Sequence, residues 1–146
     1  MDEDIKEDLY EKLKDEGIRM TRQRKAIVNL LIDNKRPMTA SDIYTILSRD
    51  DKNLRLSTIY RNLNMFVKKK VVRKIDLNID KKENYFEFIQ GEHHHHLVCV
   101  KCNEIIPFDC PLQEYEKEIS ERTNYHILDH KIKMYGICPQ CKKIIE

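Results

Sequence analysis

The 146-residue sequence contains no apolar run that approaches the roughly 20 residues needed to cross a bilayer. It also lacks the basic and apolar segments of a secretory signal, because it opens on the acidic residues Met1-Asp2-Glu3-Asp4. We therefore expect a soluble, cytoplasmic protein without a membrane partner. At this length the chain can form one ordinary domain or two small ones, and a small domain usually needs a metal or a partner subunit to be stable.

Acidic residues are scarce in one long segment. Between Gly17 and Lys74 there are fifteen Lys or Arg residues against four Asp or Glu, a local balance of +11, whereas the remainder of the chain carries −9. A basic segment of this strength is a candidate surface for binding a polyanion. A solvated charged face is the alternative that charge alone leaves open.

Four of the five cysteines form two Cys-x-x-Cys pairs, Cys99 with Cys102 and Cys138 with Cys141. In a reducing cytosol this pattern favours metal ligation over disulfides. Four thiolates satisfy Zn²⁺ completely and leave no open position for a substrate, so the pairs predict a structural zinc site. A dithiol redox centre would need only one pair in a thioredoxin-like βαβ context, which the sequence lacks. We interpret Cys110 as a small buried residue rather than a ligand.

Four consecutive histidines, 93–96, run directly into the first cysteine pair. Their interior position argues against an affinity tag. If the run continues a strand into Cys99, alternate histidines face opposite sides, so one run can serve two metal sites. The candidate ligand sets are Glu87 with His94 and His96 on one face, and His93 and His95 with Glu114 and His130 on the other.

Periodicity and capping residues predict four helices in the first half of the chain. Residues 1–16 form an amphipathic helix that Gly17 ends. Thr21 caps the second helix, and Thr39 caps the third with Asp42 at the N3 position. We expect Ser57 to cap the fourth.

The fourth helix, 57–67, is the most informative. At about 100° per residue its apolar side chains share one side. The opposite side carries Ser57, Tyr60, Arg61 and Asn64, with much hydrogen-bonding capacity and little acid. Two strand-like runs follow, 71–76 and 85–89, joined by a connector that contains Asn78, Asp80, Lys81 and Lys82.

Helices followed by a basic hairpin predict a winged helix-turn-helix, in which the last helix enters the DNA major groove. A three-helix core with an incidental hairpin is the alternative. Beyond Gly91 we expect short strands around one helix that starts near Pro111, with Leu112, Tyr115 and Ile119 as its apolar stripe, and a long strand over 126–135. The domains are thus 1–90 and 91–146.

The order of these features resembles the Fur family of bacterial metal-dependent repressors, which includes ferric uptake, zinc uptake and peroxide-responsive regulators. The resemblance rests on the winged helix, Ser57-Thr58-Ile59-Tyr60-Arg61-Asn62-Leu63, the histidine-rich hinge and the paired knuckles, and it extends from Gly17 onward. It implies an α+β fold, with an N-terminal winged helix-turn-helix domain and a small C-terminal α/β dimerisation domain that holds structural zinc. It also implies a homodimer on a palindromic, double-stranded operator.

By position, Tyr60 and Arg61 look like the family's base-contacting pair, Arg19 like its minor-groove residue, and Arg24 like a residue along the DNA backbone. The resemblance implies an intact C-terminal site of His93, His95, Glu114 and His130. The hinge site keeps Glu87, His94 and His96.

The hinge site departs from the family pattern at two positions. Pro37 stands where the DNA-binding half usually supplies a histidine, and Pro107 stands where a carboxylate follows the first knuckle. The cysteine often used by zinc-sensing members falls at Ile89, and the aspartate of peroxide-responsive members falls at Glu87.

The resemblance therefore implies a metal-responsive repressor of iron or zinc uptake genes that is not an enzyme. Its expected cofactors are structural Zn²⁺ and a regulatory divalent ion, either Zn²⁺ or Fe²⁺ with Mn²⁺ possible. A peroxide-responsive repressor is the alternative within the family. A zinc-dependent hydrolase or deaminase, with Glu87 or Glu114 as general base, and a zinc-stabilised interaction module without DNA binding are the alternatives from other classes.

Overall fold

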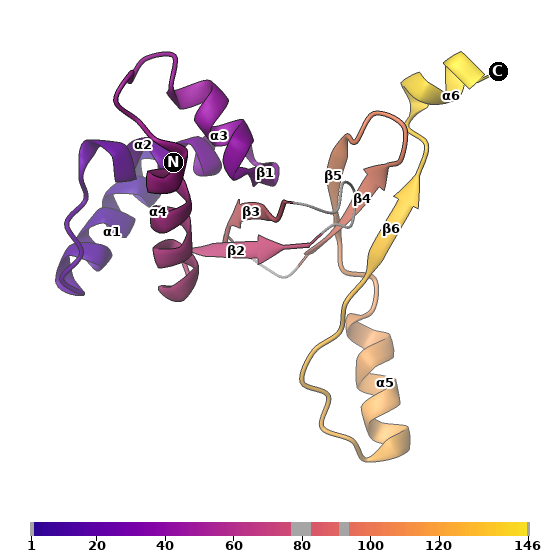
Figure 1. Ribbon diagram of the computed structural model, residues 1–146. Helices are drawn as coiled ribbons and strands as arrows, with labels where there is room; N and C mark the ends of the chain where they lie inside the picture. Colours follow the sequence, from indigo (N-terminus) through magenta and orange to yellow (C-terminus); the bar gives the residue numbers. More distant parts are fainter. Residues whose placement is uncertain (1, 77–82, 91–93, 146) are drawn as a thin grey trace. The chain divides into compact units, whose positions relative to one another are not determined.

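The computed structural model describes residues 2–76, 83–90 and 94–145, and the chain divides into two compact units, Met1–Gln90 and Gly91–Glu146. Figure 1 labels the helices and strands of both units. Within the described residues, no helix is both long enough and apolar enough to pass through a bilayer.

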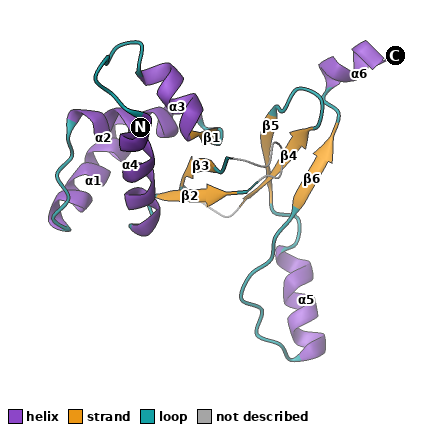
Figure 2. Ribbon diagram, in the orientation of Figure 1, coloured by secondary structure: helices purple, strands orange, loops and turns teal. Residues whose placement is uncertain are grey.

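The described part of unit 1 forms four helices and three short strands, which are distinguished by colour in Figure 2. In chain order they are α1 (Asp2–Asp15), α2 (Arg22–Asn34), β1 (Met38–Thr39), α3 (Ala40–Leu47), α4 (Leu56–Lys68), β2 (Val72–Ile75) and β3 (Tyr85–Phe88).

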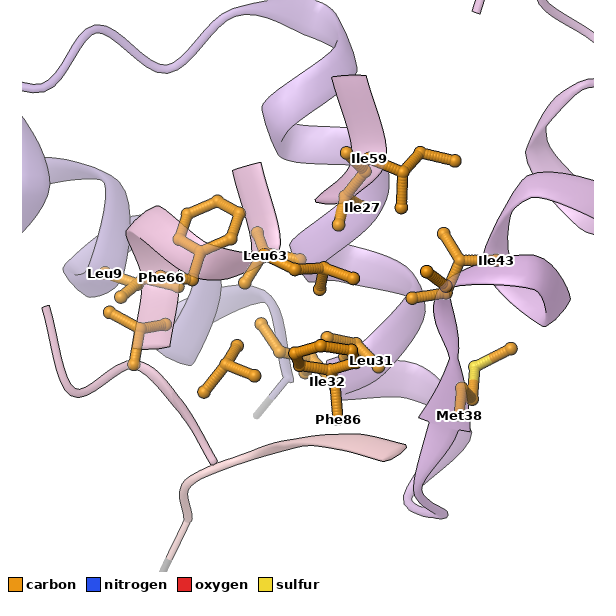
Figure 3. Close-up of a cluster of buried hydrophobic side chains, with 14 of the residues drawn as sticks. Leu9, Ile27, Leu31, Ile32, Met38, Ile43, Ile59, Leu63, Phe66 and Phe86 are labelled. Atoms are coloured by element: carbon orange, nitrogen blue, oxygen red, sulfur yellow. The ribbon is translucent and has the colours of Figure 1, made fainter. Parts of the chain in front are cut away.

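The hydrophobic core of unit 1 is built from one face of every helix and from the sheet (Figure 3). Phe66 of α4 and Phe86 of β3 are its largest fully buried side chains. Burying an aliphatic or aromatic side chain contributes about 1.5 to 3 kcal/mol. The core therefore fixes the orientation of α4 on the rest of the unit. Its fully buried members also include Leu13, Ile27, Val28, Ile43, Ile59 and Leu63.

The expected caps of the second and third helices are confirmed. The Thr21 side chain accepts from the Arg24 backbone N–H, and Thr39 forms a reciprocal capping box with Asp42. The expected cap of the fourth helix is wrong. The helix α4 begins at Leu56, its N-cap Arg55 makes no side-chain capping bond, and Ser57 lies exposed within the first turn.

The two predicted strands of the wing form an antiparallel pair, β2 with β3, and the sheet gains a third strand that the sequence did not suggest. β1 pairs antiparallel with β3, with Met38 opposite Phe86, so the strand order is β1-β3-β2. The predicted connector residues 78 and 80–82 lie outside the described residues.

Over residues 94–145, unit 2 forms a second three-stranded sheet with two helices. Its elements are β4 (His94–Cys99), β5 (Ile105–Asp109), α5 (Gln113–Thr123), β6 (Lys133–Gly136) and α6 (Pro139–Ile145). The strand order is β5-β4-β6, in which β5 is antiparallel and β6 parallel to β4. A parallel neighbour needs a crossover, and α5 lies within that connection.

Two expectations for unit 2 are wrong. Regular strand geometry is confined to Lys133–Gly136, and residues 124–132 form an irregular segment that begins at Asn124 in the left-handed conformation, at φ 58°. The helix α5 buries none of its residues, and Tyr115 of the expected apolar stripe is 54% exposed. Figure 1 shows α5 beyond the end of the unit's sheet rather than across its face. Within the described part of unit 2, the buried apolar side chains are Val98, Cys99 and Ile105.

Candidate metal centres and DNA-binding face

The four paired cysteines lie together in unit 2. Cys99 and Cys102 flank the tight turn that follows β4, where Asn103 adopts a left-handed φ of 63°, and Cys138 and Cys141 stand at the start of α6. Their four sulfur atoms lie within 4.8 Å of one another, and the Sγ atoms of Cys102 and Cys138 are 3.7 Å apart. A tetrahedral Zn²⁺ with Zn–S bonds of about 2.3 Å places its sulfur atoms about 3.8 Å apart. The cluster therefore fits zinc.

The surroundings of these thiols prepare one of them for ligation. Backbone N–H groups, first that of Cys102 and then that of Cys138, lower the pKa of Cys99 to about 6. The Cys138 N–H donates to Cys99 Sγ at 3.3 Å. In contrast, the hydrogen bond with Cys138 and desolvation raise the pKa of Cys141 to about 12. Adjacent thiols resist ionising together unless a cation balances their charge, which is what a metal ion supplies.

The histidine run alternates across the sheet, as predicted. The rings of His94 and His96 lie edge to face with centroids 4.9 Å apart, while His95 contacts His130. His93 lies outside the described residues, so its place in a ligand set stays a prediction.

The side of β4 that carries His95 holds a cluster of possible ligands. His95 Nε2 is 3.0 Å from His130 Nε2, and Cys110 Sγ is 3.2 Å from the same nitrogen. On its other side, His130 Nδ1 is 2.7 Å from the Glu116 carboxylate. Imidazole and thiolate are donors that suit Zn²⁺ and Fe²⁺. This part of unit 2 is thus a second candidate metal centre.

The membership of this cluster differs from the expected ligand set. Glu114 is exposed on α5 and is absent from the three residues whose donor atoms converge, whereas Cys110, interpreted as a small core residue, belongs to them. One signal in the sequence could have found Cys110. The first cysteine pair implies a hairpin turn, and counting outward from that turn brings the residues after β5 beside the histidine run.

The outward face of α4 is the candidate DNA-binding surface of unit 1. As the helical period predicts, Ile59, Leu63 and Phe66 are buried. The opposite side leaves Ser57, Tyr60, Arg61 and Asn64 exposed. Lys68 lies in the last turn, where it complements the helix dipole. The Tyr60 hydroxyl donates to the Glu83 carboxylate at 3.4 Å. Partial desolvation and this carboxylate raise the pKa of the phenol.

A family model described as the ferric uptake regulator family matches residues 15–135. The chain belongs to this family. The ferric uptake regulation protein of Legionella pneumophila is 35% identical over 134 residues, which cover 90% of this chain and 97% of that one. The peroxide operon regulator of Bacillus subtilis is 33% identical over 141 residues, which cover 96% of this chain and 94% of that one. The structure of the Helicobacter pylori ferric uptake regulator superposes on this chain with a TM-score of 0.82 at 26% identity. The match covers 97% of this chain and 94% of that one, and that structure is described as having three functional metal binding sites.

As a member of the ferric uptake regulator family, the protein is a metal-responsive transcriptional regulator that binds DNA, and it is not an enzyme. The family assignment confirms the α+β fold, with a helical DNA-binding domain followed by an α/β domain that carries the four-cysteine cluster. The hydrolase and deaminase alternatives are thereby dropped.

Pro37 and Pro107, which stand where the family pattern has metal ligands, both lie in described parts of the structure. Pro37 is buried immediately before β1, and Pro107 lies opposite His96 on β5. Neither offers a donor atom. Glu87 lies on β3 of unit 1, is 6% exposed, and its Oε1 is 3.5 Å from Arg73 Nη1 on the neighbouring strand. His94 and His96 belong to unit 2, so the hinge ligand set of Glu87, His94 and His96 stays a prediction.

Arg19 and Arg24, the other residues expected at DNA, are joined to each other. Arg24 Nη1 donates to the Arg19 carbonyl oxygen at 2.7 Å, and Arg24 Nε donates to the side-chain oxygen of Asn62 at 3.1 Å. The Arg19 residue is exposed, whereas Arg24 is half-buried.

Proposed function

We propose that the protein represses metal uptake genes by binding a palindromic operator as a homodimer when Zn²⁺ or Fe²⁺ is bound. The observation that carries this proposal is the two-sided helix α4. Its inner side is locked into the core of unit 1, and its outer side presents Tyr60, Arg61 and Asn64. In the major groove, Arg reads guanine and Asn reads adenine through bidentate hydrogen bonds.

The homodimer is supported by the composition of unit 2. Unit 2 exposes several large apolar side chains: Val100, Ile106, Tyr115, Leu128, Met134 and Tyr135. A unit with so few buried apolar residues is marginal by itself, and a second copy would remove this surface from water. We expect two copies of unit 2 to form the interface.

In this proposal, metal acts by selecting one pose of the paired DNA-binding domains. Operator half-sites one helical turn apart require reading helices about 34 Å apart. The metal favours that pose only through the difference between its affinities for the two poses, about 1 to 3 kcal/mol in typical allosteric systems. We propose Glu87, His94 and His96 as hinge ligands, because Glu87 lies on β3, the last strand of the wing, and the two histidines lie on β4, the first strand of the second domain. Residues His93, His95 and His130 are proposed for the C-terminal site.

A mobility shift on a promoter fragment from a metal uptake gene tests the proposal. The protein is first treated with a mild chelator until one zinc per chain remains, and then titrated with Zn²⁺, Mn²⁺ or, without oxygen, Fe²⁺. We expect operator binding to need at least one added ion per chain and the active species to be a dimer by light scattering. Equal binding with and without added metal, or a monomer on DNA, would refute it.

A peroxide-responsive repressor is the second candidate, favoured by the likeness to the Bacillus subtilis peroxide operon regulator. The two candidates separate in one experiment. The iron-loaded protein is exposed to hydrogen peroxide, and operator binding is compared with mass spectrometry of the peptide that carries His94 and His96. Loss of operator binding, together with a mass increase of this peptide by one oxygen atom, supports the peroxide role. Retained binding supports metal uptake control.

A further inference from the structure

Three side chains of unit 2 converge on one point from separate parts of the chain. His95 projects from β4, Cys110 follows the last residue of β5, and His130 comes from the segment before β6. Phe108 lies opposite His95 in the ladder, so Cys110, two residues further, is on the same face as its diagonal neighbour. Hairpin register therefore holds Cys110 beside His95.

The hydrogen-bonding capacity of His130 does not account for this convergence. Its Nδ1 faces the Glu116 carboxylate at 2.7 Å, and because a carboxylate accepts, Nδ1 carries a proton and donates. The remaining Nε2 offers one lone pair, or one proton, in the ring plane. Yet both His95 Nε2 and Cys110 Sγ approach it, at 3.0 and 3.2 Å. One hydrogen cannot give both contacts good geometry, whereas a cation between the three atoms accepts a lone pair from each.

The distances suit a first-row divalent ion. Bond lengths of about 2.0 Å for Zn–N and about 2.3 Å for Zn–S place tetrahedral ligand atoms about 3.3 Å apart for two nitrogens and about 3.5 Å apart for nitrogen and sulfur. The observed contacts are a few tenths of an ångström shorter, so small outward shifts of the side chains would admit the ion. His95 is 5% exposed and the His130 side chain 21%, so the site has limited access to water.

We propose that Cys110 is a thiolate ligand of this second centre, beside the nitrogen ligands His95 and His130, and that Glu116 fixes the orientation and tautomer of His130. A carboxylate behind a metal-binding histidine is a recurrent arrangement that raises the basicity of the ring. The thiolate shifts preference toward Zn²⁺ and Fe²⁺ and away from Mn²⁺, which favours oxygen ligands. The regulatory meaning of the site rests on the proposed function, but ion binding does not require DNA.

Cobalt substitution of the full-length protein tests the ligand set directly. Protein that retains one zinc per chain is titrated with Co²⁺, and its absorption spectrum and zinc content are recorded. We expect visible bands of a low-symmetry, four-coordinate Co²⁺ together with a sulfur-to-cobalt charge-transfer band in the near ultraviolet, while the zinc stays bound. The charge-transfer band should vanish in Cys110→Ser.

Two matched variants on α5 test the role of the carboxylate. Glu116→Ala should weaken Co²⁺ binding about 10- to 100-fold. The Glu114→Ala variant, two residues away on the exposed side, should change it less than about twofold. The assignment is overturned if the wild-type spectrum lacks the sulfur band, a result that needs no variant to fold. It is also overturned if the band persists in Cys110→Ser with the zinc retained. A normal cobalt spectrum with no metal-dependent mobility shift would instead refute the proposed function and leave this site standing.

Discussion

Arg24 on α2 donates from Nε to the side-chain oxygen of Asn62 on α4 at 3.1 Å, which ties the candidate reading helix to α2. Asn62 is 5% exposed, so its amide is cut off from water. The same guanidinium donates to the Arg19 carbonyl, which holds the segment that precedes α2. Arg24 therefore positions two parts of the basic segment.

We predict that Arg24→Ala lowers the free energy of unfolding by about 1 to 3 kcal/mol, because it leaves a buried amide oxygen without its donor. Arg22→Ala is the matched control, since Arg22 is exposed on the same helix and should change stability by less than about 0.5 kcal/mol. Urea denaturation followed by circular dichroism measures both. If Arg24→Ala unfolded like the wild type and weakened only operator binding, Arg24 would be a phosphate contact instead.

The helices of unit 1 were predictable because their signals are local. Thr21 and Thr39 cap the helices that follow them, and apolar spacing alone identified the buried side of α4. The expected boundary at Ser57 was wrong because the helix begins one residue earlier, at Leu56, without a capping side chain to mark its start. The strand β1 could not be inferred, since two residues gain strand geometry only through pairing with β3.

The candidate metal sites show the same difference between local and long-range signals. The four cysteines were predictable because thiolate spacing is itself a metal signature. Cys110 was missed because its neighbours His95 and His130 lie 15 and 20 residues away in sequence. The pairing of β4 with β5 brings Cys110 beside His95, and the segment before β6 brings His130 to them. The long strand over 126–135 failed because alternating apolar residues predict a strand only where a partner strand accepts them, and Leu128 is 86% exposed.

We predict that Arg61→Ala costs about 1 to 3 kcal/mol in binding to the operator and relaxes the preference for one base pair. Lys68→Ala, at the end of the same helix, should weaken binding to the operator and to unrelated DNA equally. It should also lower the slope of log affinity against log salt concentration by about one. Fluorescence anisotropy with both DNAs at several salt concentrations separates these outcomes. An equal loss on both DNAs in Arg61→Ala would argue that Arg61 contacts only phosphate.

We predict that Glu87→Ala raises the metal concentration needed for half-maximal operator binding by at least about tenfold, because it removes an anionic ligand from the hinge. The control is Arg73→Ala, which removes the ion pair at Glu87 and keeps the carboxylate. If both variants raised the metal requirement equally, the ion pair rather than ligation would explain the effect.

We predict that proton release on binding the first equivalent of zinc depends on pH around 6. The pKa of Cys99 is lowered to about 6, so above that pH this sulfur is already a thiolate and releases no proton to zinc. As the pH falls from about 7.5 to about 5.5, Cys99 becomes about three-quarters protonated, and we expect proton release to rise by about 0.7. Calorimetry in buffers of different ionisation enthalpy counts these protons. A release that stayed at four at both pH values would show that the metal-free cluster loses the backbone hydrogen bonds that lower this pKa.

We predict that stripping zinc from the four-cysteine cluster unfolds unit 2 and leaves unit 1 folded. Among the described residues, the unit 1 core contains sixteen buried apolar side chains, whereas those of unit 2 are Val98, Cys99 and Ile105. The stability of unit 2 must therefore come largely from the metal and from any partner subunit.

A strong chelator, or Cys138→Ser, should collapse the backbone NMR signals of residues 94–145 into the unfolded range while those of α1 to α4 keep their dispersion. Cys110→Ser is the control, because it leaves all four ligands of the cluster in place and should preserve both sets of signals. Unchanged signals in unit 2 after complete loss of zinc would mean that the sheet and its partner contacts stabilise the unit without the metal.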